Sequence, residues 1–151
     1  MNAIELLKAD HREVEGYFEK VEATGPEKHE EIFKKIKNAL DVHAHIEETI
    51  FYPRLLKTKD DDLRSIVKEG IEEHRQIKMF LKEIAALTAD AEKFEAKLNV
   101  LMEDTRHHVK EEEGEMFPKV EKDLTADDLD ELGRSLEQEK RSAKTMAKGN
   151  G

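Results

Sequence analysis

The stretch His43-Ala44-His45-Ile46-Glu47-Glu48-Thr49-Ile50-Phe51-Tyr52-Pro53 has a counterpart later in the chain, His108-Val109-Lys110-Glu111-Glu112-Glu113-Gly114-Glu115-Met116-Phe117-Pro118. Both fit the pattern H-x-x-x-E-E-x-x-x-x-P. Each is preceded by a segment with a lone histidine: His11 lies 32 residues before His43, and His74 lies 34 residues before His108. The sequence therefore looks internally duplicated, each half being a helical hairpin with one histidine on its first helix and a His/Glu pair on its second.

The spacing of the His/Glu pair indicates metal binding. Residues four apart share one face of a helix and lie about 6 Å apart along its axis, so both can reach one metal ion or an adjacent pair of ions. Two hairpins packed face to face would bring six donors to one level of the core: His11, His43, Glu47, His74, His108 and Glu112. This mixture of nitrogen and oxygen donors suits iron, manganese or zinc better than calcium or magnesium.

Apolar residues recur at helical spacing along almost the whole chain, and the candidate ligands occupy positions on the same stripes. Four long segments joined by short loops predict an all-α, up-down-up-down four-helix bundle over residues 1–122. Pro53 is expected to disturb the end of the second helix. A weaker stripe predicts an additional C-terminal helix over 123–147 of the same domain, opened by a capping box at Thr125–Asp128, and a disordered tail at 148–151.

Composition narrows the classes of function. The 151 residues suit one domain, and the formal net charge of -10 argues against binding nucleic acid or an anionic membrane surface. The lack of cysteine excludes disulfides, thiolate metal sites and cysteine nucleophiles. No apolar run suits a membrane span or signal peptide, so a cytoplasmic protein is expected. The fifth helix could cover the bundle or form a dimer contact, which leaves a monomer or a weak homodimer open.

Metal-free interpretations are weaker. A lone histidine on an apolar stripe is usually a hydrogen-bonded core residue, but four of them on four helices are harder to explain in that way. A buried network of charges without a cation would leave too many groups needing partners, because an unpaired buried carboxylate costs several kcal/mol. The remaining histidines, His29, His45 and His107, are expected at the surface. Glu48 and Glu113 are expected to support the ligands from outside or to face solvent.

These residues resemble the hemerythrin family, in its broad bacterial branch of HHE cation-binding domains, over Ile4 to Lys122. The resemblance implies two iron ions with an oxo or hydroxo bridge, for which manganese or zinc could substitute. It implies that His11, His43, His74 and His108 are terminal ligands and that Glu47 and Glu112 are bridging carboxylates. A ferritin-like carboxylate site is disfavoured because the chain contains no E-x-x-H.

The chain departs from the oxygen-carrying hemerythrins at two places. Those proteins usually have aspartate where Glu112 stands, and they have a further histidine where this chain has Lys78. The missing histidine would leave an additional open metal position, and an exchangeable position favours reactivity. Lys78 could donate a hydrogen bond to a bound ligand or extend to the surface.

The resemblance and the open position lead to three hypotheses. The first is a protein that binds or senses dioxygen or a related small ligand such as peroxide or nitric oxide. The second is a di-iron oxidoreductase of the peroxidase or catalase type that consumes peroxide or another reactive oxygen or nitrogen species. The third is iron storage or iron-level sensing, in which metal occupancy controls stability.

Overall fold

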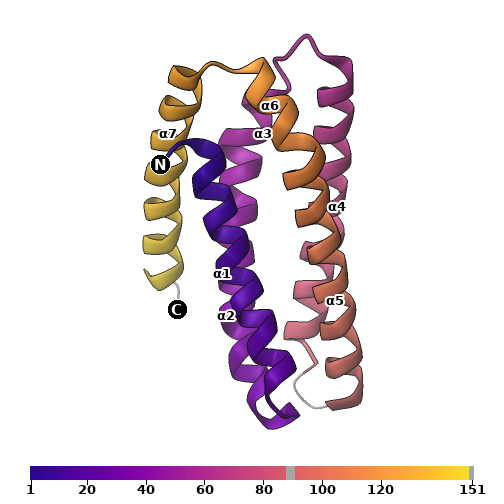
Figure 1. Ribbon diagram of the computed structural model, residues 1–151. Coiled ribbons are helices and arrows are strands. Elements are labelled where there is room, and N and C mark those ends of the chain that lie inside the picture. Colours follow the sequence, from indigo (N-terminus) through magenta and orange to yellow (C-terminus); the bar gives the residue numbers. More distant parts are fainter. Residues whose placement is uncertain (88–90, 150–151) are drawn as a thin grey trace.

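The computed structural model describes residues 1–87 and 91–149, and every regular element in these ranges is helical (Figure 1). The elements are α1 (Ala3–Ala23), α2 (Pro26–Ile46), η1 (Glu47–Phe51), α3 (Tyr52–Leu55), α4 (Asp61–Ala85), α5 (Ala91–Glu111), η2 (Glu112–Met116), α6 (Phe117–Asp123) and α7 (Ala126–Gly149). The two η elements are π-helical turns. The predicted all-α class, with four long helical rods and one additional helix, is confirmed.

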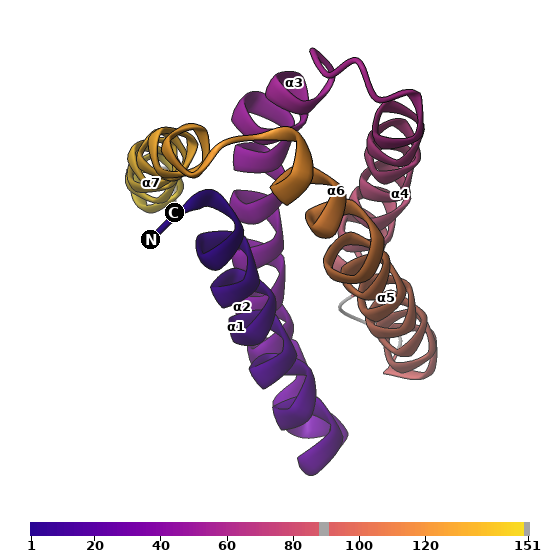
Figure 2. The ribbon, with the colours of Figure 1, turned by 45° about the horizontal axis from the view of Figure 1, so that its top comes forward.

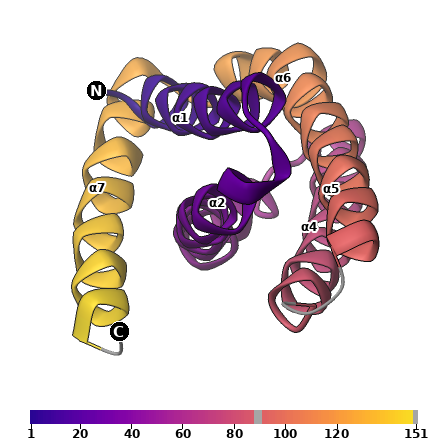
Figure 3. The same cartoon turned by 90° about the horizontal axis from the view of Figure 1, so that it is seen from below.

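The bundle consists of two helical hairpins. One is formed by α1 and by the rod that continues from α2 through η1 into α3, and the other by α4 and the rod from α5 through η2 to α6 (Figures 1 and 2). Helix α7 lies outside these four rods, against α1 and α2 (Figure 3). Each hairpin corresponds to one copy of the repeated sequence pattern.

The C-terminal helix begins and ends later than the range 123–147 expected from its apolar pattern. The capping box forms as predicted, because the Asp128 backbone N–H donates to Thr125 Oγ1 while the Thr125 N–H donates to Asp128 Oδ2, each at 3.0 Å. Leu124 is extended, so α7 starts at Ala126 and not at residue 123. The helix continues to Gly149, two residues into the expected tail, and residues 150–151 lie outside the described range.

The apolar core is divided into two parts by a layer of polar side chains. One part surrounds the buried rings of Phe51, Tyr52 and Phe117, near the start of α1 and α4. The other surrounds Phe18 and Phe33 at the opposite end of the bundle. Apolar residues hold the helices together above and below the polar layer, and these contacts keep water from its side chains.

His29 was expected at the surface, and that prediction is wrong: its exposed fraction is 6%. Its Nε2 donates to the Val21 carbonyl at 2.8 Å, and its Nδ1 lies 2.8 Å from Glu95. The carbonyl belongs to the last turn of α1, where helix carbonyls lack partners within the helix. His29 is buried because it satisfies that helix end and links it to α5.

The substitution His29→Gln should destabilise the protein more at pH 6 than at pH 9. Burial lowers the pKa of His29, but the hydrogen bond and charge of Glu95 outweigh this and raise the pKa above its ordinary value of 6.5. The stabilisation from the protonated ring is therefore fully present below pH 6.5 and is lost as pH rises through the raised pKa. Urea unfolding should show a loss of about 1 kcal/mol at pH 6 and less at pH 9. An equal loss at both values, or the same pattern for the exposed control His107→Gln, would contradict this role.

Candidate metal centre

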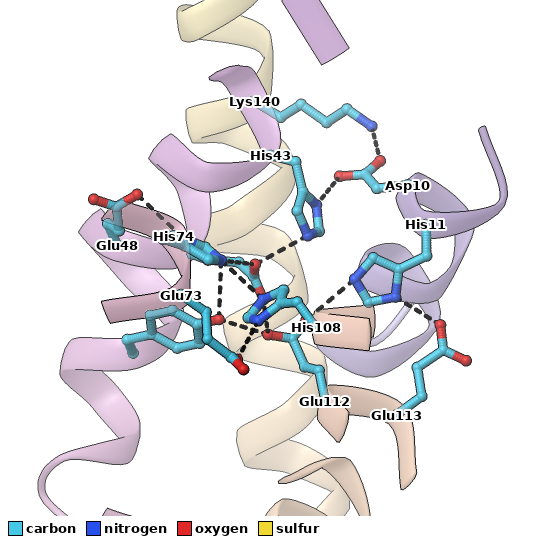
Figure 4. Close-up of polar contacts among 12 residues, drawn as sticks. Asp10, His11, His43, Glu48, Glu73, His74, His108, Glu112, Glu113 and Lys140 are labelled. Carbon is cyan, nitrogen blue, oxygen red and sulfur yellow. Dashed lines mark hydrogen bonds and ion pairs between the residues drawn. The ribbon is translucent and has the colours of Figure 1, made fainter. Parts of the chain in front are cut away.

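The six side chains predicted as metal ligands lie together in the polar layer. Figure 4 labels all of them except Glu47. Each of the four rods contributes one histidine, and each glutamate is the first residue of a π turn. The histidines are 4–6% exposed and the glutamates 0–1%: His11, His43, Glu47, His74, His108 and Glu112. Helices from both halves of the repeat therefore converge on one buried set of donors.

The two glutamates sit between the histidines and are shared by them. Glu112 directs Oε1 toward His11 Nε2 at 3.1 Å and Oε2 toward His108 Nε2 at 3.4 Å. Glu47 Oε1 lies 3.0 Å from His43 Nε2 and 3.1 Å from His74 Nε2. Two donor groups result, one of Glu47, His74, His108 and Glu112 and one of His11, His43 and Glu112. Glu112 belongs to both groups.

Several of these atoms have no hydrogen-bond partner among the described residues. They are Nε2 of His11 and His43, both oxygens of Glu47, and Oε1 of Glu112. The Nε2 atoms of His11 and His43 lie about 3 Å from oxygens of Glu112 and Glu47, but these pairs do not form hydrogen bonds. Buried polar atoms are almost always satisfied, and a buried unpaired carboxylate is costly. The donor set therefore fits divalent or trivalent cations held between the histidines and glutamates.

Each histidine is also held from outside by a carboxylate on its Nδ1. The distances are 2.6 Å for His11–Glu113, 3.0 Å for His43–Asp10, 3.2 Å for His74–Glu48 and 2.7 Å for His108–Glu73. A carboxylate only accepts, so Nδ1 carries a proton and Nε2 is the ring nitrogen that faces the centre. The four contacts follow the sequence repeat, because the residue before each lone histidine and the residue after each central glutamate supply them.

The expectation that Glu48 and Glu113 support ligands from outside agrees with these contacts. The sequence analysis assigned no role to Asp10 or Glu73. The signal was available, because each residue directly precedes a lone histidine in its half of the repeat. On a helix, neighbouring side chains point in different directions, so the residue before an inward histidine reaches the adjacent rod.

Burial and neighbouring charges shift the pKa values of several groups in the cluster. Burial lowers the pKa of His108, but its contacts with Glu112 and Glu73 outweigh this and raise the pKa to about 10. Burial likewise lowers the pKa of His43, while the charge of Glu47 and the Asp10 contact bring it well above the ordinary value. Burial raises the pKa of Glu112, yet His108 and His11 hold it well below its ordinary value. A metal ion that binds these imidazoles must displace their protons.

The π turns widen the backbone where the glutamates enter the layer. In each turn the closing backbone bond spans five residues: Tyr52 N–H donates to the Glu47 carbonyl, and Phe117 N–H donates to the Glu112 carbonyl. Each turn directly precedes a short helix with proline in its first positions, Pro53 in α3 and Pro118 in α6. The expected disturbance near Pro53 thus takes the form of a π turn, a feature common at functional sites.

Tyr52 is a site residue that the sequence analysis missed. Its hydroxyl donates to Glu112 Oε2 at 2.5 Å and lies 3.2 Å from His74 Nε2, and the residue is 1% exposed. Gly70 faces it, and a Cβ there would lie 3.4 Å from the hydroxyl, at ordinary van der Waals distance. In the other half of the repeat the same place holds Phe117, whose ring stacks on His11. A tyrosine at the place of a phenylalanine was the only signal in the sequence.

We expect Tyr52→Phe to destabilise the metal-free protein by about 1.5–3 kcal/mol, since it removes a buried hydrogen bond to a charged group. Urea unfolding measures this loss. The matched control is Tyr17→Phe, which removes a more exposed hydroxyl that donates to Glu13 at 3.2 Å. The control should change stability by no more than about 0.5 kcal/mol. Equal effects of the two substitutions would contradict the assignment.

A small apolar cavity of about 30 Å³ lies beside the four histidines. That volume exceeds the 10–15 Å³ that one water requires and suits a molecule of very few atoms. Apart from the histidines and Thr105, its walls are mostly aliphatic: Val14, Leu40, Ala44, Ile77, Leu81, Val109 and the side chain of Lys78. Lys78 Nζ lies 2.5 Å from Glu48 Oε1 and is partly exposed, so its charged end supports an outer carboxylate and leaves the cavity apolar.

Comparison with known proteins agrees with the site. The family model described as the hemerythrin HHE cation binding domain matches residues 2–120. The chain is 27% identical over 137 residues to a DNA nickase of Nostoc sp., which covers 87% of this chain and 37% of that protein. It is 27% identical over 103 residues to an uncharacterized hemerythrin-like protein of Schizosaccharomyces pombe, covering 68% of this chain and 51% of that protein. No solved structure matches the chain.

The chain belongs to the hemerythrin HHE cation-binding domain family. It is a cation-binding domain with a buried His/Glu cluster suitable for a metal site. The chain spans about half or less of the length of the two curated relatives. Within the described residues, no helix has the length and apolar character that crossing a membrane requires.

Proposed function

We propose that the centre holds two iron ions and binds or senses dioxygen or a related small ligand such as peroxide or nitric oxide. The observation that carries this proposal is Glu112, whose two oxygens face histidines of different donor groups. A pair of metal ions with exchangeable positions can bind and activate small ligands. Manganese or zinc could substitute, since the same nitrogen and oxygen donors suit them.

The ligands divide between the two metal positions by contact. One position would be held by His74 and His108 and the other by His11 and His43, with Glu47 and Glu112 between them. The outer carboxylates orient all four imidazoles before a metal arrives, which reduces the entropy that binding must overcome.

The properties of the cavity favour a small, uncharged ligand. Its walls are mostly aliphatic, it adjoins all four histidines, and its volume of about 30 Å³ suits a molecule of very few atoms. Apolar walls also exclude water from the ligand that binds there, and this strengthens electrostatic interactions with the centre. The Lys78 ammonium group pairs with Glu48, so Lys78 does not replace the histidine that oxygen carriers have at this place.

The alternative is an enzyme that consumes peroxide or another reactive oxygen or nitrogen species. The Tyr52 hydroxyl favours it, because a buried hydroxyl held against Glu112 and His74 could donate a hydrogen bond to a ligand at the centre. Iron storage or iron-level sensing is a further alternative. It would couple occupancy to stability without ligand chemistry.

One experiment separates these functions. Protein reconstituted with iron under nitrogen is mixed with dioxygen, peroxide or nitric oxide while its absorption spectrum is recorded. A stable, reversible spectrum supports binding or sensing, whereas rapid peroxide consumption that is lost in His74→Ala supports the enzyme. Stability that depends on iron with no response to any of the three ligands would support storage and contradict the main proposal.

The partners and location expected from the sequence stay predictions: no nucleic acid, no membrane, a monomer or weak homodimer, and a cytoplasmic protein. The Nostoc relative carries the name DNA nickase, but this chain corresponds to only 37% of it. The net charge of -10 opposes contact with a phosphate backbone. We therefore propose no role on DNA for this domain.

A further inference from the structure

Helix α7 makes polar contacts with α1 and α2 close to the metal centre, although it lies beyond the 2–120 match to the family. Two consecutive residues make the contacts. Glu139 Oε1 lies 2.8 Å from Nε2 of His45, a neighbour of a candidate ligand on α2. Lys140 Nζ donates to Oδ1 of Asp10 on α1, whose Oδ2 lies 3.0 Å from His43 Nδ1 (Figure 4). A chain of three polar side chains thus runs from α7 to the centre.

Asp10 differs from the other outer carboxylates in its burial. Its side chain is 7% exposed, against 27–35% for Glu48, Glu73 and Glu113. If one of the more exposed carboxylates loses a hydrogen bond to a side chain, water can replace it. A buried carboxylate that loses one partner is strongly destabilised, so it must move or admit water. The position of Asp10 therefore depends on Lys140 to a degree that the other three supports do not share.

Close backbone packing fixes the position of α7 along the bundle. A Cβ at Gly133 would lie 2.5 Å from the Met1 carbonyl oxygen and 2.8 Å from the Asn2 carbonyl carbon. Only glycine permits this approach, because the neighbouring atoms belong to the backbone of residues 1–3 and cannot move aside without shifting the chain. Leucines of α7 also belong to the same apolar core cluster as Leu6 and Leu7 of α1. Lys140 is consequently presented to Asp10 by a helix in one fixed register.

We propose that Lys140 is a positioning residue of the metal centre, which holds Asp10 in place and thereby fixes the orientation of the His43 imidazole. The metal position of His11 and His43 then depends on α7, whereas the position of His74 and His108 does not. The two positions become unequal even though the sequence repeat makes their donors similar. The part of the inference that concerns metal rests on the proposed centre.

The test uses Lys140→Met, which removes the charge, and Lys140→Arg, which retains it. The matched control is Arg141→Met, because Arg141 is the next residue, is 77% exposed and pairs with Glu137 on the same helix. Nitrogen-15 NMR of metal-free protein measures solvent exchange of each imidazole Nδ1–H. A chelator then measures the release of zinc from zinc-loaded protein. Thermal unfolding verifies that each variant is folded.

We expect Lys140→Met to speed exchange at His43 by about 3- to 10-fold, with His74 and His108 unchanged, and to speed release of one of two zinc equivalents. Lys140→Arg should keep both the His43 exchange rate and the zinc release rate close to those of the unmodified protein. Arg141→Met should change neither rate. Unchanged exchange at His43, or equal acceleration at all four histidines, would overturn the inference. If two zinc ions bind but their release is insensitive to Lys140, the inference fails and the metal centre stands. If no zinc binds, the proposed centre fails, and the exchange rates alone still decide whether Lys140 positions His43.

Discussion

Removing the metal ions should lower the midpoint of thermal unfolding by about 10 °C. A ligand that binds only the folded protein at a thousand times its Kd stabilises by about 4 kcal/mol. For a chain of this size, each kcal/mol corresponds to about 2–4 °C. Calorimetry of chelated and of iron- or zinc-reconstituted protein measures the difference. The matched control is Glu112→Ala, whose midpoint should respond to metal about a third as much or less, because the carboxylate shared by both donor groups is gone.

The same difference in stability should grow as pH rises. In metal-free protein the raised pKa of His108, about 10, means that stabilisation by the protonated ring is fully present below pH 6.5. That stabilisation is lost as pH rises toward 10. Metal-bound imidazoles carry no proton on the coordinating nitrogen, so the loaded protein should not lose this contribution. A difference that stays constant or shrinks between pH 6.5 and 10 would contradict the proton-for-metal exchange.

Truncating a shared carboxylate should remove more tightly bound metal ions than truncating a histidine. Glu112 belongs to both donor groups, and His11 belongs to one. We expect Glu112→Ala to weaken binding at both positions by at least about 100-fold, so that a titration with Co²⁺ shows no tight equivalent. His11→Ala should retain one tight equivalent of the original two.

The exposed neighbour His45→Ala provides the control for this titration, since its side chain is 47% exposed and pairs with Glu139 outside the donor groups. It should bind two equivalents. If Glu112→Ala kept two tight equivalents, the carboxylate would not lie between two ions. If His11→Ala lost both equivalents, the two positions would not be separable as the contacts indicate.

The bundle could be predicted because its determinants are local and repeated. Apolar residues at helical spacing and short loops define four rods. The same helical period predicts which side chains point into the core. A histidine that fills a gap in an apolar stripe must point inward with that stripe. His11, between the core residues Leu7 and Val14, is the clearest example. The chain length of each hairpin then brings the histidines to one level.

The features that sequence missed depend on contacts between distant elements. His29 reads as an exposed helix start until the end of α1 and Glu95 are seen beside it. No role was predicted for Tyr52, because only the folded chain brings Glu112, 60 residues away, to its hydroxyl. Periodicity also cannot reveal the π turns, which differ from α-helix by one residue in hydrogen-bond span. Lys140 lies 130 residues from Asp10, and no spacing rule connects them.

The most direct test of the central claim is a crystal structure of the iron-loaded protein with anomalous scattering measured at the iron edge. We predict two peaks in the polar layer, one against His74 and His108 and the other against His11 and His43, with Glu112 in contact with both. A single peak, no peak, or iron at the half-buried cluster of Glu73, His107 and Glu111 would contradict a two-metal centre held by the buried residues.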